Sequence, residues 1–470
     1  MTLNRLWLFL AVALPVLAAV LAPLSTVDLA YQLRAGDEIL AARALPSVDT
    51  WTFTAAGQPW VDQQWGAQVI LAGVFDVAGW TGLVLLRAAL TGVIFAALLV
   101  IARRRGLDAR TSAVLVIGAF AVAAPAMGLR PQLFGMACFA IVLLLVADRR
   151  ARPRALWLVP LVTIAWANLH GSFVLAPVVL GLAWLEDLHD RITPRYGTLL
   201  VAAATVLAAC VTPLGPSVWA YAVALSANPE VTARISEWQP TSIRTVAGLL
   251  FFGSAALVVL LIARRGRVVS WPTLAWLATF ALLGLYAERG VAWWPLALVP
   301  VLAGTLIPAT ADRVRVEPPL MRRLNGIVAA LLTLTAVALL PVWRPVDPVT
   351  GAPDGLLTDA PPALTAAVRD TAAAGAERVF QPQPWGSWFE FAVPDVLVAI
   401  DSRIELFPAS VWDDYERVVA GVEGWDAQLA AWAVDLVVVE AEQEGFRARL
   451  EAAGWQVLIE DDDGAVLHRP

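Results

Sequence analysis

The chain has 470 residues, of which 59% are hydrophobic and only 15% are charged, and its mean hydropathy is +0.70. Soluble globular domains contain about 45–50% apolar residues, so this composition excludes an ordinary soluble protein and predicts a polytopic α-helical membrane protein. The formal net charge is −6, and all 33 basic residues are arginines. They form no basic stripe, so membrane lipids are expected as partners and nucleic acid is not.

The first apolar run extends from Leu6 to Leu24, directly after Arg5, and is long enough to cross a hydrocarbon core of about 30 Å. A cleaved signal peptide usually has an apolar core of only about 7–15 residues, so a retained anchor is predicted. With this anchor the pattern predicts about 11 transmembrane helices. The further spans are expected at 81–102, 110–127, 131–147, 155–169, 172–186, 196–212, 245–263, 271–287, 291–308 and 324–341.

Arginine clusters occur in every second loop between these spans. Short cytoplasmic loops are enriched in Lys and Arg, which predicts a cytoplasmic N-terminus and an extracytoplasmic location for everything after Pro341. The stretch Gly66 to Gly79 is apolar, but counting it as a span would move one cluster outside, so we interpret it as an interfacial helix. The clusters are Arg103, Arg104, Arg105 and Arg110; Arg149, Arg150, Arg152 and Arg154; Arg191 and Arg195; Arg264, Arg265 and Arg267; and Arg313, Arg315, Arg322 and Arg323.

The first outside loop, 25–80, combines carboxylates with tryptophans beside a membrane-spanning segment. A carboxylate so close to a span is costly unless it has a function, and tryptophan favours the membrane interface. Asp28 lies nearest the end of the first span and is the predicted catalytic residue, whereas Asp37 and Glu38 are expected on a solvated helix face. The other members are Asp49, Asp62, Trp51, Trp60 and Trp65.

Four further polar residues stand in the other outside loops: Arg130, His170, Glu237 and Arg289. Each has a simpler explanation, because an arginine at a helix end can snorkel and a lone histidine is often a hydrogen-bonded cap. Together, on one face of a bundle, they would provide the groups that hold a lipid-linked phosphate and activate a hydroxyl.

The composition changes after the last span. Residues 342–362 are rich in Pro, Asp and Gly and are predicted to be a linker, and 363–470 are predicted to form a soluble α/β domain with a largely parallel sheet. Asp401 and Arg403 follow a strand directly, where parallel sheets bind ligands; a structural ion pair between them is the alternative. The strands are expected at Val396–Ile400, Leu436–Val439 and Gln456–Ile459, and the helices near 363–374, 409–421, 425–433 and 442–453.

This order of parts resembles the C-type (GT-C) membrane glycosyltransferases, in particular bacterial relatives of the dolichyl-phosphate-mannose-protein mannosyltransferases. The resemblance spans nearly the whole chain and is more specific for the architecture than for one reaction. It is carried by the pieces DLAYQLRAGDEIL, LPSVDTWTFTAAGQPWVDQQW, LRPQLFG, ANLHGSF, ISEWQP, WGSWFEF and IDSRIELFP.

The resemblance implies transfer of a sugar from a polyprenyl-phosphate-linked donor to an envelope glycan, lipid or protein on the outer face of the bacterial plasma membrane. The family's first outside loop supplies an acidic residue that acts as a base or supports a divalent metal, the one cofactor implied, and Asp28 matches that position. The commonest pattern has two adjacent acidic residues there, whereas here Leu29 follows Asp28. The candidates for substrate binding are Asp49, Trp65, Arg130, His170, Glu237, Arg289, Asp401 and Arg403.

Two other classes of function remain open. A transporter or flippase often has repeated halves and broken helices near the membrane midplane, but the sequence has no evident internal repeat and its polar residues gather at one surface. A catalytically silent scaffold or binding protein would use the bundle as an anchor for the C-terminal domain.

Overall fold

The computed structural model describes residues 1–193, 196–228, 232, 234–265, 269–307, 312 and 317–469. The chain divides into two compact units, each built from two segments that are far apart in sequence. Unit 1 contains Met1–Ala22 and Val84–Leu340, and unit 2 contains Pro23–Leu83 and Pro341–Pro470. Four of the clustered arginines lie outside the described residues: Arg195, Arg267, Arg313 and Arg315.

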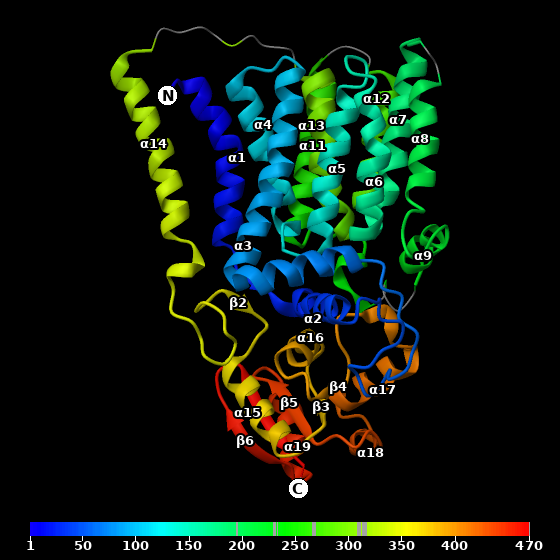
Figure 1. The fold of residues 1–470 in the computed structure, drawn as a ribbon, viewed down its shortest axis with the longest axis vertical. Helices are drawn as coiled ribbons and strands as arrows, with labels where there is room; N and C mark the ends of the chain where they lie inside the picture. The colour runs from blue at the N-terminus through cyan, green and yellow to red at the C-terminus, as the bar shows by residue number, and fades with distance from the viewer. Residues whose placement is uncertain are drawn as a thin grey trace. The chain divides into compact units, whose positions relative to one another are not determined.

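Unit 1 is a bundle of helices, most of which run in roughly the same direction (Figure 1). In chain order they are α1 (Leu3–Leu21), the second part of α3 (Trp65–Arg104), α4 (Ala109–Ala123), α5 (Pro131–Ala147), α6 (Leu158–Leu169), α7 (Leu175–His189), α8 (Gly197–Ala208), α9 (Ser217–Ser226), α11 (Val246–Arg265), α12 (Trp271–Tyr286), α13 (Trp293–Val301) and α14 (Pro319–Ala338).

The helices of this bundle are those of a multi-pass membrane protein, as the composition predicts. Each predicted span contains a helix. Within the described residues, six helices are both long and apolar enough to cross a membrane, and four shorter apolar helices accompany them. The six are Leu3–Leu21, Trp65–Arg104, Ala109–Ala126, Gly171–His189, Val246–Arg264 and Pro319–Ala338.

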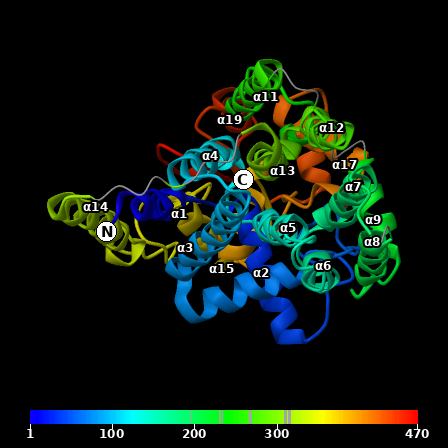
Figure 2. The ribbon, with the colours of Figure 1, turned by 90° about the horizontal axis from the view of Figure 1, so that it is seen from above.

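Helix α5 lies in the interior of unit 1, and the view along the bundle shows it surrounded by other helices (Figure 2). Its buried residues point in every direction around the helix, from Leu133 and Phe134 to Phe139 and Val142. This uniform burial follows from a sequence that is apolar on all faces. In contrast, only Asn325 is buried among the residues of α14, which packs against α1.

Gly79 interrupts α3 with φ 56° and ψ −155°, a conformation that essentially only glycine adopts. The break falls where the sequence separates the predicted interfacial helix, Gly66 to Gly79, from the span expected at 81–102. The part of α3 up to Leu83 belongs to unit 2, and the part from Val84 belongs to unit 1.

Unit 2 combines the first loop with the C-terminal region, including the predicted linker 342–362. Its five-stranded sheet has the order β4-β3-β5-β7-β6. Its elements are β1 (Leu24–Ser25), α2 (Thr26–Ala42), the first part of α3, β2 (Leu357–Thr358), α15 (Pro362–Ala373), β3 (Arg378–Phe380), α16 (Gln383–Ala392), β4 (Leu397–Val398), α17 (Ala409–Ala420), α18 (Trp425–Ala431), β5 (Leu436–Glu440), α19 (Glu444–Ala452), β6 (Gln456–Glu460) and β7 (Gly464–His468).

The expectation of a largely parallel sheet is wrong for the two pairings that β7 makes. Strands β4, β3 and β5 are parallel, but β7 runs antiparallel to both β5 and β6. The cause is a tight turn in which the Asp461 carboxylate accepts hydrogen bonds from the backbone N–H groups of Asp463 and Gly464. The sequence prediction missed β7, the short strand β3 and helix α16.

The first loop extends this sheet beyond β4. Thr52 pairs with Val398 in parallel, and the backbone N–H of Phe53 donates to the Val398 carbonyl at 3.1 Å. Strand β1 likewise pairs with β2, placing Leu24 beside Leu357. The two distant segments of unit 2 therefore share backbone hydrogen bonds, which makes them one folded body.

Glycine at position 36 allows α2 to pack closely on the first part of α3. A Cβ at this position would overlap the carbonyl oxygen of Gln68 and lie 2.6 Å from the Cβ of Ala72. We expect Gly36→Ala to destabilise the protein by about 1–3 kcal/mol, because overpacking forces the two helices apart. A fall in the melting temperature would show it.

Gly73→Ala is the matched control, because Gly73 also lies on a helix of unit 2 but a Cβ there meets nothing within 4 Å. This control should leave stability unchanged or raise it by about 0.5–1 kcal/mol. Equal melting temperatures for the two variants would contradict the close packing at Gly36.

Candidate functional site

The Arg403 guanidinium is enclosed in unit 2 between two carboxylates. It donates to Asp401 from Nε at 2.9 Å and from a terminal nitrogen, which also donates to Asp49 at 2.6 Å. All three side chains are at most 1% exposed. The ion pair of Asp401 and Arg403, the alternative considered from the sequence, is therefore present and is joined by Asp49 from the first loop.

Two tryptophans of the first loop cover the same guanidinium. The carbon Cζ of Arg403 lies 4.2 Å from the ring centroid of Trp51 and 4.6 Å from that of Trp60. The rings contact each other edge to face, with centroids 5.2 Å apart. Cation–π contacts at desolvated sites contribute up to about 2 kcal/mol each, so the rings help to offset the cost of burying this charge.

Glu390 on α16 is a third carboxyl group of the enclosed cluster and is fully buried. Burial, and next the charge of Asp401, raise the pKa of Glu390 well above its usual value, although Arg403 and Arg34 act in the opposite direction. The raised pKa favours a neutral Glu390, so that Arg403 is balanced mainly by Asp49 and Asp401.

Asp28 lies in the first turn of α2, one residue after a contact with the C-terminal region. The Ser402 hydroxyl donates to the backbone carbonyl of Val27 at 2.6 Å. Tyr31 lies one turn further along the helix, on the same side as Asp28. Burial, and then the charges of Asp28 and Glu405, raise the pKa of the Tyr31 hydroxyl well above its usual value.

Tyr31 and Glu405 are functional candidates that the sequence interpretation missed. Both side chains interact electrostatically with Asp28. Both could have been found from spacing, because Tyr31 follows Asp28 by three helical positions and Glu405 follows Asp401 by four residues in IDSRIELFP. Together with Asp28 they form a group of carboxyl and hydroxyl oxygens.

Asp62 adds a buried carboxyl group to the same unit. One of its oxygens accepts a hydrogen bond from Gln68 at 2.9 Å, and the other has no hydrogen-bond partner. Burial raises the pKa of Asp62 to about 7, against the lowering effects of Gln68 and Arg403. A carboxyl group with this pKa exchanges its proton near neutral pH.

In unit 1, Arg130 and Glu237 form an ion pair with a separation of 2.7 Å. Arg130 precedes α5, and Glu237 belongs to the short 3-10 helix η4 (Ser236–Trp238). Burial would raise the pKa of Glu237, but the charge and hydrogen bond of Arg130 lower it below its usual value.

Arg289 joins this group from the 3-10 helix η5 (Glu288–Ala292). Its guanidinium carbon lies 4.7 Å from the ring centroid of Trp238, and its carbonyl accepts a long hydrogen bond from Gln132 at 3.4 Å. The structure therefore brings together three of the predicted residues in unit 1: Arg130, Glu237 and Arg289.

His170 is the fourth member of the unit 1 group and caps the helix η3 (Gly171–Val174). The backbone N–H of Ser172 donates to Nδ1 of His170 at 3.1 Å, which places the proton of the neutral ring on Nε2. Burial, then Arg289 and Arg130, lower the pKa of His170 to about 3. The ring is thus a neutral hydrogen-bond donor at physiological pH and a poor base.

The remaining candidate, Trp65, begins α3 and is half-buried. The resemblance implies a divalent metal. Among the described residues, His, Cys, Asp and Glu side chains do not form a group of three or more that could hold an ion.

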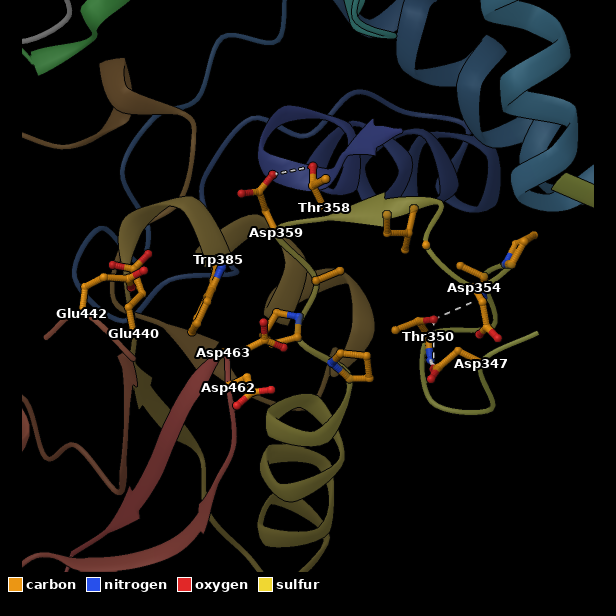
Figure 3. A pocket seen from close by; sticks show the side chains of 17 residues that line it. Asp347, Thr350, Asp354, Thr358, Asp359, Trp385, Glu440, Glu442, Asp462 and Asp463 are labelled. Carbon is orange, nitrogen blue, oxygen red and sulfur yellow. Dashed lines mark hydrogen bonds between the residues drawn. The ribbon is translucent and has the colours of Figure 1, made fainter. Parts of the chain in front are cut away.

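A cavity of about 470 Å³ in unit 2 contains none of these residues (Figure 3). Its described lining includes seven carboxylates and no basic side chain, and the ring of Trp385 forms one wall. The potential of such a cavity attracts cations. The carboxylates are Asp347, Asp354, Asp359, Glu440, Glu442, Asp462 and Asp463.

Comparison with known proteins confirms the architecture. No family model matches the sequence, and no curated protein matches it. Among solved structures the fold is similar to that of ArnT from Cupriavidus metallidurans bound to undecaprenyl phosphate, with a TM-score of 0.52 and 14% identity over 99% of this chain and 98% of that chain. The apo state of that protein aligns with a TM-score of 0.50 and 14% identity over 98% of this chain and 97% of that chain.

ArnT is a GT-C glycosyltransferase, so the predicted resemblance to the C-type membrane glycosyltransferases is confirmed as a fold. The match includes the helical bundle and the small C-terminal sheet, since it extends over nearly the whole chain.

The raised pKa of Asp62 predicts a pH-dependent effect of Asp62→Asn. The folded protein keeps a proton that the unfolded chain releases, so ionised Asp62 destabilises the fold increasingly as the pH rises from about 4 to about 7. Asp62→Asn should therefore stabilise the protein at pH 8 by on the order of 2–4 kcal/mol and have little effect near pH 4. Melting temperatures at both pH values test this.

The matched control is Asp426→Asn, which changes an exposed aspartate of the same unit. A gain of equal size at both pH values, or the same gain in the control, would contradict the assignment of a buried carboxyl to Asp62.

Proposed function

We propose that this protein is a membrane glycosyltransferase that moves a sugar from a polyprenyl-phosphate-linked donor to an acceptor of the cell envelope. The observation that carries the proposal is the full-length similarity of fold to ArnT, whose structure contains undecaprenyl phosphate. Fold alone does not define a reaction, so the proposal also depends on the chemistry of the two groups of polar residues.

Asp28 is the general base of the proposed reaction. An acceptor hydroxyl oxygen attacks the anomeric carbon of the donor, the bond from that carbon to the phosphate oxygen breaks, and the phosphate leaves with the bonding electrons. Asp28 accepts the hydroxyl proton during this displacement. Its place in the first turn of α2 suits this role, because the positive end of the helix dipole favours an ionised carboxylate.

Arg130 and Arg289 bind the donor phosphate in the proposed reaction. Guanidinium groups bind phosphate with paired, charge-assisted hydrogen bonds, and they stabilise the negative charge that develops on the leaving group. Trp238 lies against Arg289 and Glu237 pairs with Arg130, so both guanidinium groups are held in place before a ligand arrives. The Nε2 proton of His170 is a further donor for a phosphate oxygen.

A cavity of about 940 Å³ in unit 1 suits the lipid part of such a donor. Its lining comes mainly from α1, α4, α11 and α13 and is largely apolar, as with Leu115, Val258 and Leu298. At the end that the arginine clusters make cytoplasmic, the lining also includes the charged residues Asp108, Arg110, Asp312 and Glu317. Apolar surface of this kind accommodates hydrocarbon chains without unsatisfied polar groups.

The arginine-rich loops support a cytoplasmic N-terminus. In that topology the first loop and the C-terminal region, which together form unit 2, are extracytoplasmic. Soluble nucleotide sugars are made in the cytoplasm, whereas a polyprenyl-linked sugar is carried by the membrane itself, so this topology favours the lipid-linked donor. The acceptor is then an envelope glycan, lipid or protein on the outer face.

Replacement of the proposed base tests the reaction. Asp28→Asn should lower sugar transfer at least about 100-fold, since general-base catalysis typically contributes 10²–10⁴, while expression stays intact. Mass spectrometry of lipid-linked sugars and envelope glycans, in a deletion strain complemented with each variant, measures the effect. Asp37→Asn on the same helix is the control and should retain transfer, because Asp37 is exposed. Unchanged glycans with Asp28→Asn would remove Asp28 from the mechanism.

A second test concerns the phosphate. Arg130→Gln should weaken the binding of undecaprenyl phosphate to the purified protein about 10-fold or more, because a charge-assisted hydrogen bond contributes about 1.5–3 kcal/mol. Native mass spectrometry with a titration of the lipid measures the affinity. Arg152→Gln, at an exposed arginine of unit 1, is the control and should bind normally. Equal affinities in both variants would exclude Arg130 as a phosphate ligand.

A further inference from the structure

We propose that Arg403 is a positioning residue, which locks the first loop around the start of α2 and thereby sets the geometry of Asp28. This inference rests on the proposed role of Asp28. It gives Arg403, Asp401 and Asp49 a function other than the substrate binding expected from the sequence, because their side chains are enclosed and bonded to one another.

The first step of the argument is the connection between the two segments of unit 2. Arg403 and Asp401 belong to the C-terminal region, whereas Asp49 and the rings of Trp51 and Trp60 that contact the guanidinium belong to the first loop. Asp49 also accepts hydrogen bonds from the Thr52 backbone and hydroxyl, at 3.1 and 2.7 Å. The Arg403 guanidinium therefore fixes the conformation of the first loop and also attaches this loop to the C-terminal region.

The second step leads from the loop to α2. The indole N–H of Trp51 donates to the carboxylate of Glu38 at 2.7 Å, and its ring faces the guanidinium of Arg34 at 4.9 Å. Arg34 also donates to the backbone carbonyl of Glu390 at 2.5 Å. The middle and the end of α2 are thus held by residues that contact Arg403 or its neighbours.

The third step reaches Asp28 itself. Ser402 stands between Asp401 and Arg403, and its hydroxyl donates to the carbonyl of Val27, the residue before Asp28. The Thr26 hydroxyl donates to the carbonyls of Thr358 and Asp359, at 3.0 and 2.8 Å. The first turn of α2 would otherwise fray, as helix ends do, so these bonds hold Asp28 in one orientation.

Only arginine can make this set of contacts. Its planar guanidinium donates in its plane to two carboxylates, and its central carbon lies 4.2 and 4.6 Å from the ring centroids of Trp51 and Trp60, whereas the ammonium group of lysine is a compact point charge. Arg403→Lys therefore keeps the charge but loses the ring contacts and the paired hydrogen bonds.

The test is hydrogen–deuterium exchange of the full-length protein in nanodiscs. We expect Ser402→Ala and Arg403→Lys to accelerate exchange of the amides in the first two turns of α2 about 10-fold, since each removes contacts worth about one hydrogen bond or more. Ser402→Thr keeps a hydroxyl and should restore protection. The control Arg417→Ala breaks a partly exposed ion pair with Asp414 in the same unit and should change nothing in α2.

A purely structural role would accelerate exchange equally in α2, β5 and β7, and this result, or unchanged exchange in α2, would overturn the proposal. Where transfer activity is measurable, Ser402→Ala should lower kcat and leave the KM for the donor unchanged. Failure of the proposed function is recognised separately, because wild-type protein would then not bind undecaprenyl phosphate, whereas the exchange experiment does not require that lipid.

Discussion

Burial of the Arg403 charge is the constraint on which the organisation of unit 2 depends. A guanidinium that is 1% exposed is tolerated only if its charge is balanced, and here the carboxylates that balance it come from both segments of the unit. Its second terminal nitrogen has no hydrogen-bond partner among the described residues. Removing one partner of such a pair typically costs about 3–5 kcal/mol. The buried charge therefore favours a single packing position for the first loop. In this position Thr52 of the loop pairs with Val398 of the C-terminal region.

This arrangement explains how the first loop can keep the Asp28 carboxylate in one orientation, as the proposed role as a base requires. Asp28 occupies the first turn of a helix whose start and middle are bonded to the C-terminal region and whose end is bonded to Trp51 of the first loop. Unit 1 supplies a different kind of group, in which Arg130 and Arg289 provide positive charge beside a neutral His170. Base and anion-binding groups are the two requirements for displacement of a sugar from a phosphate.

Much of the fold was predictable because hydrophobic runs and helix signals are local. The runs near 131–147 and 271–287 match α5 and α12 within a residue, and the Asp401–Arg403 pair was foreseen as an alternative. The partnership of Asp49 and the two tryptophans with Arg403 was not predictable, because it joins positions that are far apart in the chain. The only local signal for Tyr31 is its spacing of three helical positions from Asp28, which many ordinary helix residues share, and β7 is a short strand that begins with Gly464, a residue type that is rare in strands.

The most direct measurement is turnover of a lipid-linked sugar by the purified full-length protein in nanodiscs. Undecaprenyl-phosphate-linked sugars extracted from bacterial membranes would be supplied together with envelope acceptors, and released undecaprenyl phosphate would be followed by mass spectrometry. The account predicts release that requires an acceptor. Binding of undecaprenyl phosphate that is no tighter than that of other anionic lipids, with no release from any donor, would contradict it.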